Sequence, residues 1–126
     1  MKSKILINPQ RERKIPRHFS WVDHRLVRQN YIKKCSADAL AMYLFLITVS
    51  DNEGLSYYRD DSITKYVSFS GTSCVKYCRQ ELIIASLIAF HEGLYQVLDL
   101  AEIDISEVTF NERLKQCNKL YSSSIT

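Results

Sequence analysis

The chain has 126 residues, enough for one domain with a modest core, and its 46% apolar and 25% charged residues are ordinary for a globular protein. The longest uncharged apolar stretch, residues 39–50, is too short to cross a bilayer, and the start lacks a signal-peptide core. These features exclude a membrane span, so we expect a cytoplasmic protein with no membrane partner.

Residues 1–18 are predicted to form a basic N-terminal arm. They contain both prolines and the run "RERK", and no apolar period is sustained, so the arm should be extended. Residues 1–34 hold ten Lys and Arg against two acidic residues, whereas the remainder of the chain is acidic on balance. Such asymmetry is typical of an arm that binds a polyanion, although a solvated tail would have the same composition.

The run "FSWVDHRLVRQNYIKK" follows the arm. Ser20 and Asp23 resemble a capping box, which predicts a short helix with Arg25 and Arg28 turned outward. We expect Trp21 to anchor this segment onto the core rather than to meet a ligand.

A central helix is predicted from Ser36 to about residue 50. Its sequence is apolar around most of its circumference, so it should be buried. Asn52 and Gly54 supply turn geometry that ends it, and "LSYY" after them is predicted to be a very short strand.

A helix-turn-helix is predicted over residues 60–85. Asp60 and Asp61 could cap a short first helix, and "SFSGTS" interrupts it. Ser70 or Thr72 could cap the second helix, whose apolar positions recur at three and four residues. The polar face of that second helix carries Ser73, Lys76, Tyr77 and Gln80.

Two short alternating segments, "LIAF" and "LYQVLDL", are separated by "HEG" and predict a β-hairpin with a tight turn at Gly93. The strand "LSYY" would then pair with this hairpin. We therefore expect a mainly α fold with a small antiparallel β-sheet (α+β), a winged helix-turn-helix, over residues 19–100.

Residues 101–126 are predicted to be an acidic C-terminal segment with a short helix. Thr109 and Glu112 form a plausible capping box. The apolar stripe that follows could pack on its own domain or form a homodimer contact, and it consists of Phe110, Leu114, Cys117 and Tyr121.

Signals of catalysis, cofactors and metals are weak. The sequence contains no phosphate-binding glycine loop and no hydrolase or metalloprotease motif, so we expect no enzyme and no cofactor. The four cysteines are interpreted as free thiols. Cys74 and Cys78 are spaced one helical turn apart, and a metal site or a redox pair there stays a remote alternative.

Binding to double-stranded DNA accounts for the features of this sequence better than catalysis or metal binding does. In a helix-turn-helix the start of the second helix enters the major groove; Lys76 could donate to guanine or a phosphate, and Gln80 could pair with adenine. Arg79 could reach the flanking backbone, and a solvated helix face is the alternative. The predicted contacts are Thr72, Ser73, Lys76, Tyr77, Arg79 and Gln80 on the helix, flanked by Arg11, Arg13, Lys14 and Arg17 on the arm.

The runs "FSWVDHRLVRQNYIKKCSADALAMYLFLITVSDNEGLSYYRDDSITKYVSFS" and "RQELIIASLIAFHEGLYQVLDL" resemble small bacterial helix-turn-helix proteins of mobile genetic elements. More loosely, they are similar to the winged-helix domains of plasmid and phage replication initiators. The resemblance implies DNA binding in transposition, replication or transcription regulation. The predicted hairpin, which would be the wing, is poor in basic residues, and this departs from the usual winged-helix pattern. The alternative function is an interaction module that recruits a transposase or replication partner.

Overall fold

The computed structural model describes residues 3–100. Within that range a three-residue helix η1 (Pro9–Arg11) lies in the arm, and the body begins with α1 (Arg25–Arg28) and η2 (Ile32–Lys34). The body then continues as α2 (Ala37–Val49), β1 (Leu55–Tyr57), α3 (Asp60–Val67), α4 (Thr72–Ile84), β2 (Ile88–His91) and β3 (Leu94–Val97). The C-terminal helix predicted over 109–121, its dimer contact and Cys117 lie outside the described residues.

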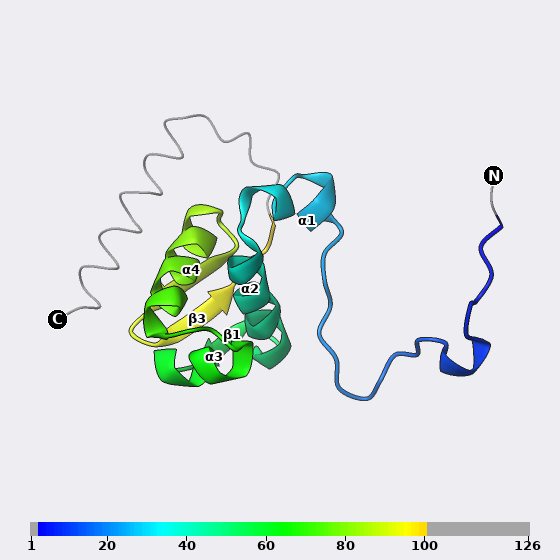
Figure 1. Cartoon of the computed structure of the whole chain (residues 1–126), viewed down its shortest axis with the longest axis horizontal. Helices are drawn as coiled ribbons and strands as arrows, with labels where there is room; N and C mark the ends of the chain where they lie inside the picture. Colours follow the sequence, from blue (N-terminus) through cyan, green and yellow to red (C-terminus); the bar gives the residue numbers. More distant parts are fainter. Residues whose placement is uncertain (1–2, 101–126) are drawn as a thin grey trace.

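Helix α2 is the centre of the body, as its sequence predicts. It begins after Ser36, whose hydroxyl oxygen accepts the Ala39 N–H at 3.1 Å and so caps the helix. Met42 and Leu46 are fully buried between the other elements. Figure 1 shows α2 between α4 on one side and the C-terminal end of the arm on the other, with α3 across one end.

The three strands form one antiparallel sheet in the order β1-β3-β2. The hairpin register pairs Phe90 with Tyr95 and His91 with Leu94. Glu92 and Gly93 form its two-residue turn with φ values of 46° and 86°, and positive φ at both positions is the requirement of a type I′ turn. Strand β1 pairs with β3, as predicted for "LSYY".

Gly54 brings the end of α2 and β1 against β3. Its φ is +82°, its carbonyl accepts the Val97 N–H at 2.8 Å, and a Cβ here would lie 2.8 Å from the Val97 carbonyl oxygen. Only glycine adopts this conformation and tolerates this contact without displacement of the backbone.

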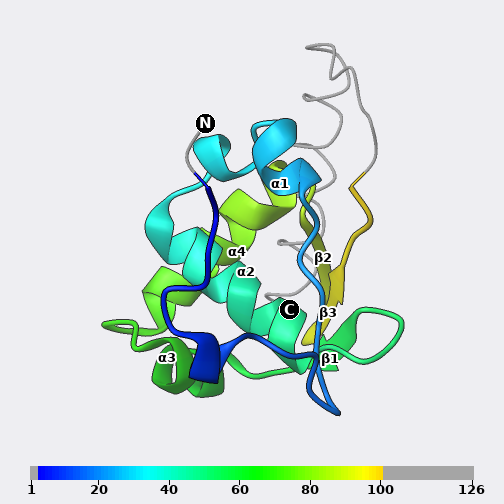
Figure 2. The ribbon, with the colours of Figure 1, turned by 90° about the vertical axis from the view of Figure 1, so that its right-hand side faces the viewer.

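The body consists of two layers, with the helices on one side and the sheet on the other (Figure 2). Tyr95 and Ile88 of the sheet are buried against Leu82 of α4 and Ile63 of α3. These contacts form one continuous core, so the expected α+β class and the expected order of elements from α2 to β3 are observed. No helix in residues 3–100 is both long and apolar enough to cross a bilayer.

Three local predictions are wrong. The helix after the arm begins at Arg25 rather than near Trp21, because Asp23 accepts the Arg25 N–H at 2.8 Å and also pairs with its guanidinium at 2.8 Å. Trp21 is not anchored in the core: its side chain is 70% exposed. The caps also differ, since Arg59 and Gly71 precede α3 and α4 and neither helix has a side-chain cap.

Candidate nucleic-acid interface

The turn between α3 and α4 fixes the angle between the two helices. Helix α3 ends at Ser68, which adopts the left-handed conformation with φ 59°, and the Phe69 N–H donates to the Thr64 carbonyl at 3.0 Å. Gly71 then leads directly into α4. The chain therefore reverses in four residues, and α4 packs on both α2 and α3. Within residues 3–100 the opposite side of α4 is uncovered (Figure 1).

The open side of α4 carries the predicted polar residues. Successive residues turn by about 100° around a helix, so Ser73, Lys76, Tyr77 and Gln80 fall within one arc of about 100°. Ser73, Lys76 and Tyr77 are exposed, Tyr77 to 78%, and Gln80 is half-buried. Thr72 is exposed at the first turn. We call these five residues the outer face of α4.

Arg79 does not belong to the outer face, which corrects the prediction that it reaches a DNA backbone. Its side chain is buried, with 6% of the residue exposed. The guanidinium donates to Asp60 Oδ1 at 2.7 Å and to Tyr95 Oη at 2.8 Å, and lies 4.3 Å from the centre of the Phe90 ring. The sequence could not reveal this, because these partners are distant along the chain.

The contacts of Arg79 join α4 to α3 and to the sheet. Burial acts to lower the pKa of Arg79, but the hydrogen bonds and charge interactions with Asp60 and Tyr95 together outweigh burial, and the pKa is raised overall. The guanidinium is therefore always charged, and the carboxylate of Asp60 neutralises it.

Glu81 ties the other flank of α4 to α2. Its carboxylate accepts the Ser36 N–H at 2.6 Å and the Ser36 hydroxyl at 2.8 Å. Arg79 and Glu81 lie about 200° apart around the helix. The outer face is thus the arc between two attached flanks.

The four predicted arm residues Arg11, Arg13, Lys14 and Arg17 are all exposed. None of them forms a salt bridge within residues 3–100, so their charges are open to an external anion. Residues 19–100, by contrast, contain eight Lys and Arg against nine Asp and Glu. The excess of positive charge is confined to the arm.

The structure does not bring the arm and the outer face of α4 together. In Figure 1 the arm leaves α1 on the side of α2 that is opposite to α4, and Figure 2, viewed from the arm, shows α4 behind α2. The prediction that the arm flanks this helix is therefore wrong. In this conformation the two predicted contact regions face opposite directions.

The hairpin turn has no basic side chain. His91 and Glu92 are exposed there, 3.9 Å apart between ring nitrogen and carboxylate. Both are solvated, and the carboxylate would repel a phosphate. The outer face of α4 thus has no cationic support from the turn.

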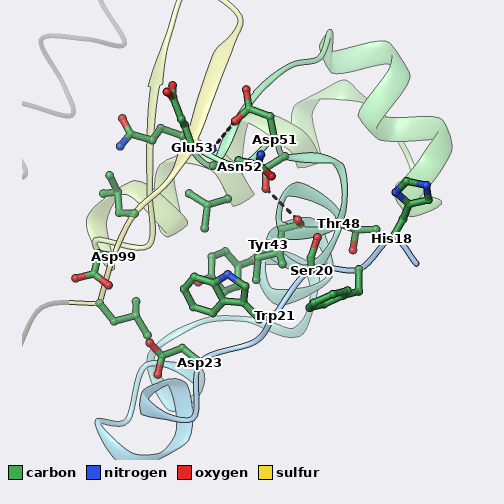
Figure 3. Close-up of a pocket in the computed structure, with 18 of the residues that line it drawn as sticks. His18, Ser20, Trp21, Asp23, Tyr43, Thr48, Asp51, Asn52, Glu53 and Asp99 are labelled. Atoms are coloured by element: carbon green, nitrogen blue, oxygen red, sulfur yellow. Dashed lines mark hydrogen bonds between the residues drawn. The ribbon is translucent and has the colours of Figure 1, made fainter. Parts of the chain in front are cut away.

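Sequence reasoning missed a groove beside the arm. It has a volume of about 1040 Å³ and lies between residues 17–23, the end of α2 with its following turn, and residues 96–100. Figure 3 shows Asp51 and Glu53 at one end, Asp99 and Asp23 toward the other, and Trp21 and Tyr43 between them. The signal in the sequence was "FSWV", an apolar run without a helical period.

The cysteines of the described residues are free thiols, at positions 35, 74 and 78. Burial, followed by the neighbouring Cys74, raises the pKa of Cys78 to about 12, which keeps this thiol protonated and unreactive. In residues 3–100 no cluster of three or more His, Cys, Asp or Glu has the arrangement of a metal site.

Comparison with known proteins adds no relative to this geometry: no family model, no curated protein and no solved structure matches the chain.

Proposed function

We propose that the chain is a winged helix-turn-helix protein that binds double-stranded DNA in the cytoplasm, with no catalytic activity. The sequence resemblance adds that it serves a mobile genetic element, in replication, transposition or transcription regulation. The single observation that carries DNA binding is the outer face of α4, an exposed polar arc on the second helix of a tightly turned pair.

Support for the winged-helix class comes from connectivity. The strand after α2 pairs with the strand that ends the hairpin, in the order β1-β3-β2, and the hairpin follows the second helix of the pair directly. Such an arrangement leaves one side of α4 uncovered by the sheet. A major groove admits a helix in this position, with its first residues at the base edges.

The side chains of the outer face suit contact with a duplex, and Lys76 is the cation among them. Lys76 would donate to guanine O6 and N7 or to a phosphate, Gln80 to adenine, and Ser73 or Thr72 to a phosphate at the helix start. Arg79 is withdrawn from this set because its guanidinium is buried. The arm supplies the remaining affinity through phosphates, on the same duplex after reorientation or on a neighbouring one.

The test is fluorescence anisotropy of a labelled random-sequence duplex at two salt concentrations. We expect Lys76→Ala combined with Gln80→Ala to weaken binding at least tenfold, with the melting temperature unchanged. The matched control is Lys33→Ala, because Lys33 is equally exposed but lies in η2, beside the other end of α4. Equal affinities of the double variant and the wild type would remove α4 from the interface.

A second candidate function is a protein-interaction module, and one observation favours it. The folded body has no excess of positive charge and carries the groove lined by Trp21 instead. If the wild-type chain and a chain lacking residues 3–17 both fail to bind duplex at low salt, the interaction module replaces DNA binding as the function.

A further inference from the structure

The groove beside the arm leaves aromatic side chains open. Phe19 and Trp21 lie along one wall, and both are more than 60% exposed, whereas Tyr43 at the base is buried. Exposed aromatic residues that converge on one concavity are the usual mark of a binding surface rather than of packing. An occupant with apolar side chains would remove this surface from water.

The rim of the groove carries the exposed residues Glu53 and Asp99, and Arg17 and His18 line it where the arm enters. Glu53 forms no ion pair within residues 3–100, and the Asp99 carboxylate is largely exposed although it reaches Arg25 at 3.2 Å. The Asp51 carboxylate accepts the N–H groups of Glu53 and Leu55, each at 2.9 Å. These hydrogen bonds fix the turn that carries Asp51 and Glu53. The exposed carboxylates favour an occupant that brings a cation with its apolar residues.

The chain at the end of β3 and beyond it, residues 96–100, lines the groove. The Val97 N–H donates to Gly54, and the Leu98 N–H donates in the other direction to Leu87 at 3.0 Å. In an extended chain, backbone groups two residues apart point to the same side, so the N–H and C=O of Asp99 should face the side that the Val97 N–H faces. At Asp99, strand β1 no longer lies on that side. Asp99 makes no backbone hydrogen bond within the described residues.

The arm contains a segment with the matching chemistry. Residues 4–7 read Lys-Ile-Leu-Ile, and Ile5 is 83% and Ile7 fully exposed, without any apolar contact to the body. β-branched residues of this kind favour an extended strand. Arg17 is the first arm residue that lines the groove, and the arm before it runs away from the body (Figure 1), so this segment lies away from the groove of its own chain.

We propose that the groove binds residues 4–7 of a second copy of this chain, as a strand added beside residues 98–100, with two copies exchanging their arms. Ile5 and Ile7 would cover Phe19 and Trp21, and Lys4 would meet the exposed carboxylates of the rim. Because each copy has one arm and one groove, the exchange closes as a twofold dimer. The proposal goes beyond DNA binding and does not depend on it.

Sedimentation equilibrium of the full chain over a range of concentrations tests this assembly. We expect a dimer for the wild type, and a dissociation constant at least tenfold higher for Ile7→Asp. The matched control is Ile15→Asp, the same change at another largely exposed arm residue outside the segment, which should leave the dimer intact. A monomeric wild type at all concentrations would overturn the proposal.

Complementation shows whether the contact is made between chains. Ile7→Asp removes a working arm and Trp21→Asp removes a working groove, so each variant alone should be largely monomeric. A mixture of the two should contain heterodimers, because one intact arm meets one intact groove. A mixture without heterodimers contradicts arm exchange, as does a wild-type dimer that Leu114→Asp dissociates and Ile7→Asp does not.

Discussion

The folded body and the N-terminal arm use arginine in opposite ways. In the body, Arg79 is enclosed by Asp60, Tyr95 and Phe90, and its charge is neutralised inside the protein. In the arm, Arg11, Arg13 and Arg17 are exposed and form no salt bridge with any residue from 3 to 100. The same residue type thus holds the body together in one region and is open to an external anion in the other. The sequence alone had predicted DNA contacts both for Arg79 and for the arginines of the arm.

The largest effect should come from removing the buried guanidinium. Arg79→Ala leaves Asp60 and the Tyr95 hydroxyl without their partner, and we expect a loss of about 3 kcal/mol in the free energy of unfolding. Chemical denaturation monitored by circular dichroism measures it. Arg59→Ala is the control, since its ion pair with Asp61 is exposed, and a change below about 0.5 kcal/mol is expected there. Equal losses in both variants would contradict the contrast between buried and exposed arginine.

A smaller loss is expected at the junction of β1 and β3. Gly54→Ala should destabilise the body by about 2 kcal/mol, because of the positive φ and the contact with the Val97 carbonyl. Gly71→Ala provides the comparison: its backbone is extended and an added Cβ meets nothing within 4 Å. Thermal melts of the two variants should differ clearly, and a tolerated Gly54→Ala would show that the strand contact gives way.

A weaker effect should appear only at high pH. Burial, with a contribution from Asp23, raises the pKa of Tyr43 to about 12 from 10.0, so folding favours the neutral phenol. That stabilisation is complete below pH 10 and is lost as the pH rises toward 12. Tyr43→Phe should therefore lose less stability than the wild type between pH 10 and pH 12 in thermal melts. Tyr57→Phe, at an exposed position, should follow the wild type.

The smallest effect on stability belongs to the arm. Replacing Arg11, Arg13, Lys14 and Arg17 together by Ala should leave the melting temperature unchanged, because all four are exposed and form no salt bridge in the described part of the chain. DNA affinity should fall, and the slope of log affinity against log salt should become shallower by about 3.6 units. An unchanged slope would mean that the arm does not neutralise phosphates.

The order and type of the elements in the body could be predicted from the sequence, because period and turn chemistry are local. Residues 36–49 are apolar around a helix, and α2 ends at Val49, before the turn residues Asn52 and Gly54. Glu92 and Gly93 lie between two alternating runs. The pairing of β1 with the hairpin was predicted from the order of elements in a winged helix. These features depend on neighbours within a few residues.

The candidate site was predicted only in part. The exposed face of α4 follows from a 3.6-residue period, but the burial of Arg79 depends on Asp60 and Tyr95, 19 and 16 residues away. The prediction that Trp21 is anchored on the core was wrong for a similar reason, because the burial of Trp21 depends on the path of the chain after the arm. The groove arises where three separate segments meet, and no single segment encodes it.

The attachment of α4 on two flanks has a consequence for encounter with a ligand. Arg79 and Glu81 prevent the helix from rolling about its axis, so Lys76 and Tyr77 keep one orientation before anything binds. A target that fits meets a rigid template and loses little conformational entropy there on association. Association at α4 should then proceed in a single kinetic phase, without a slow rearrangement of the helix after collision.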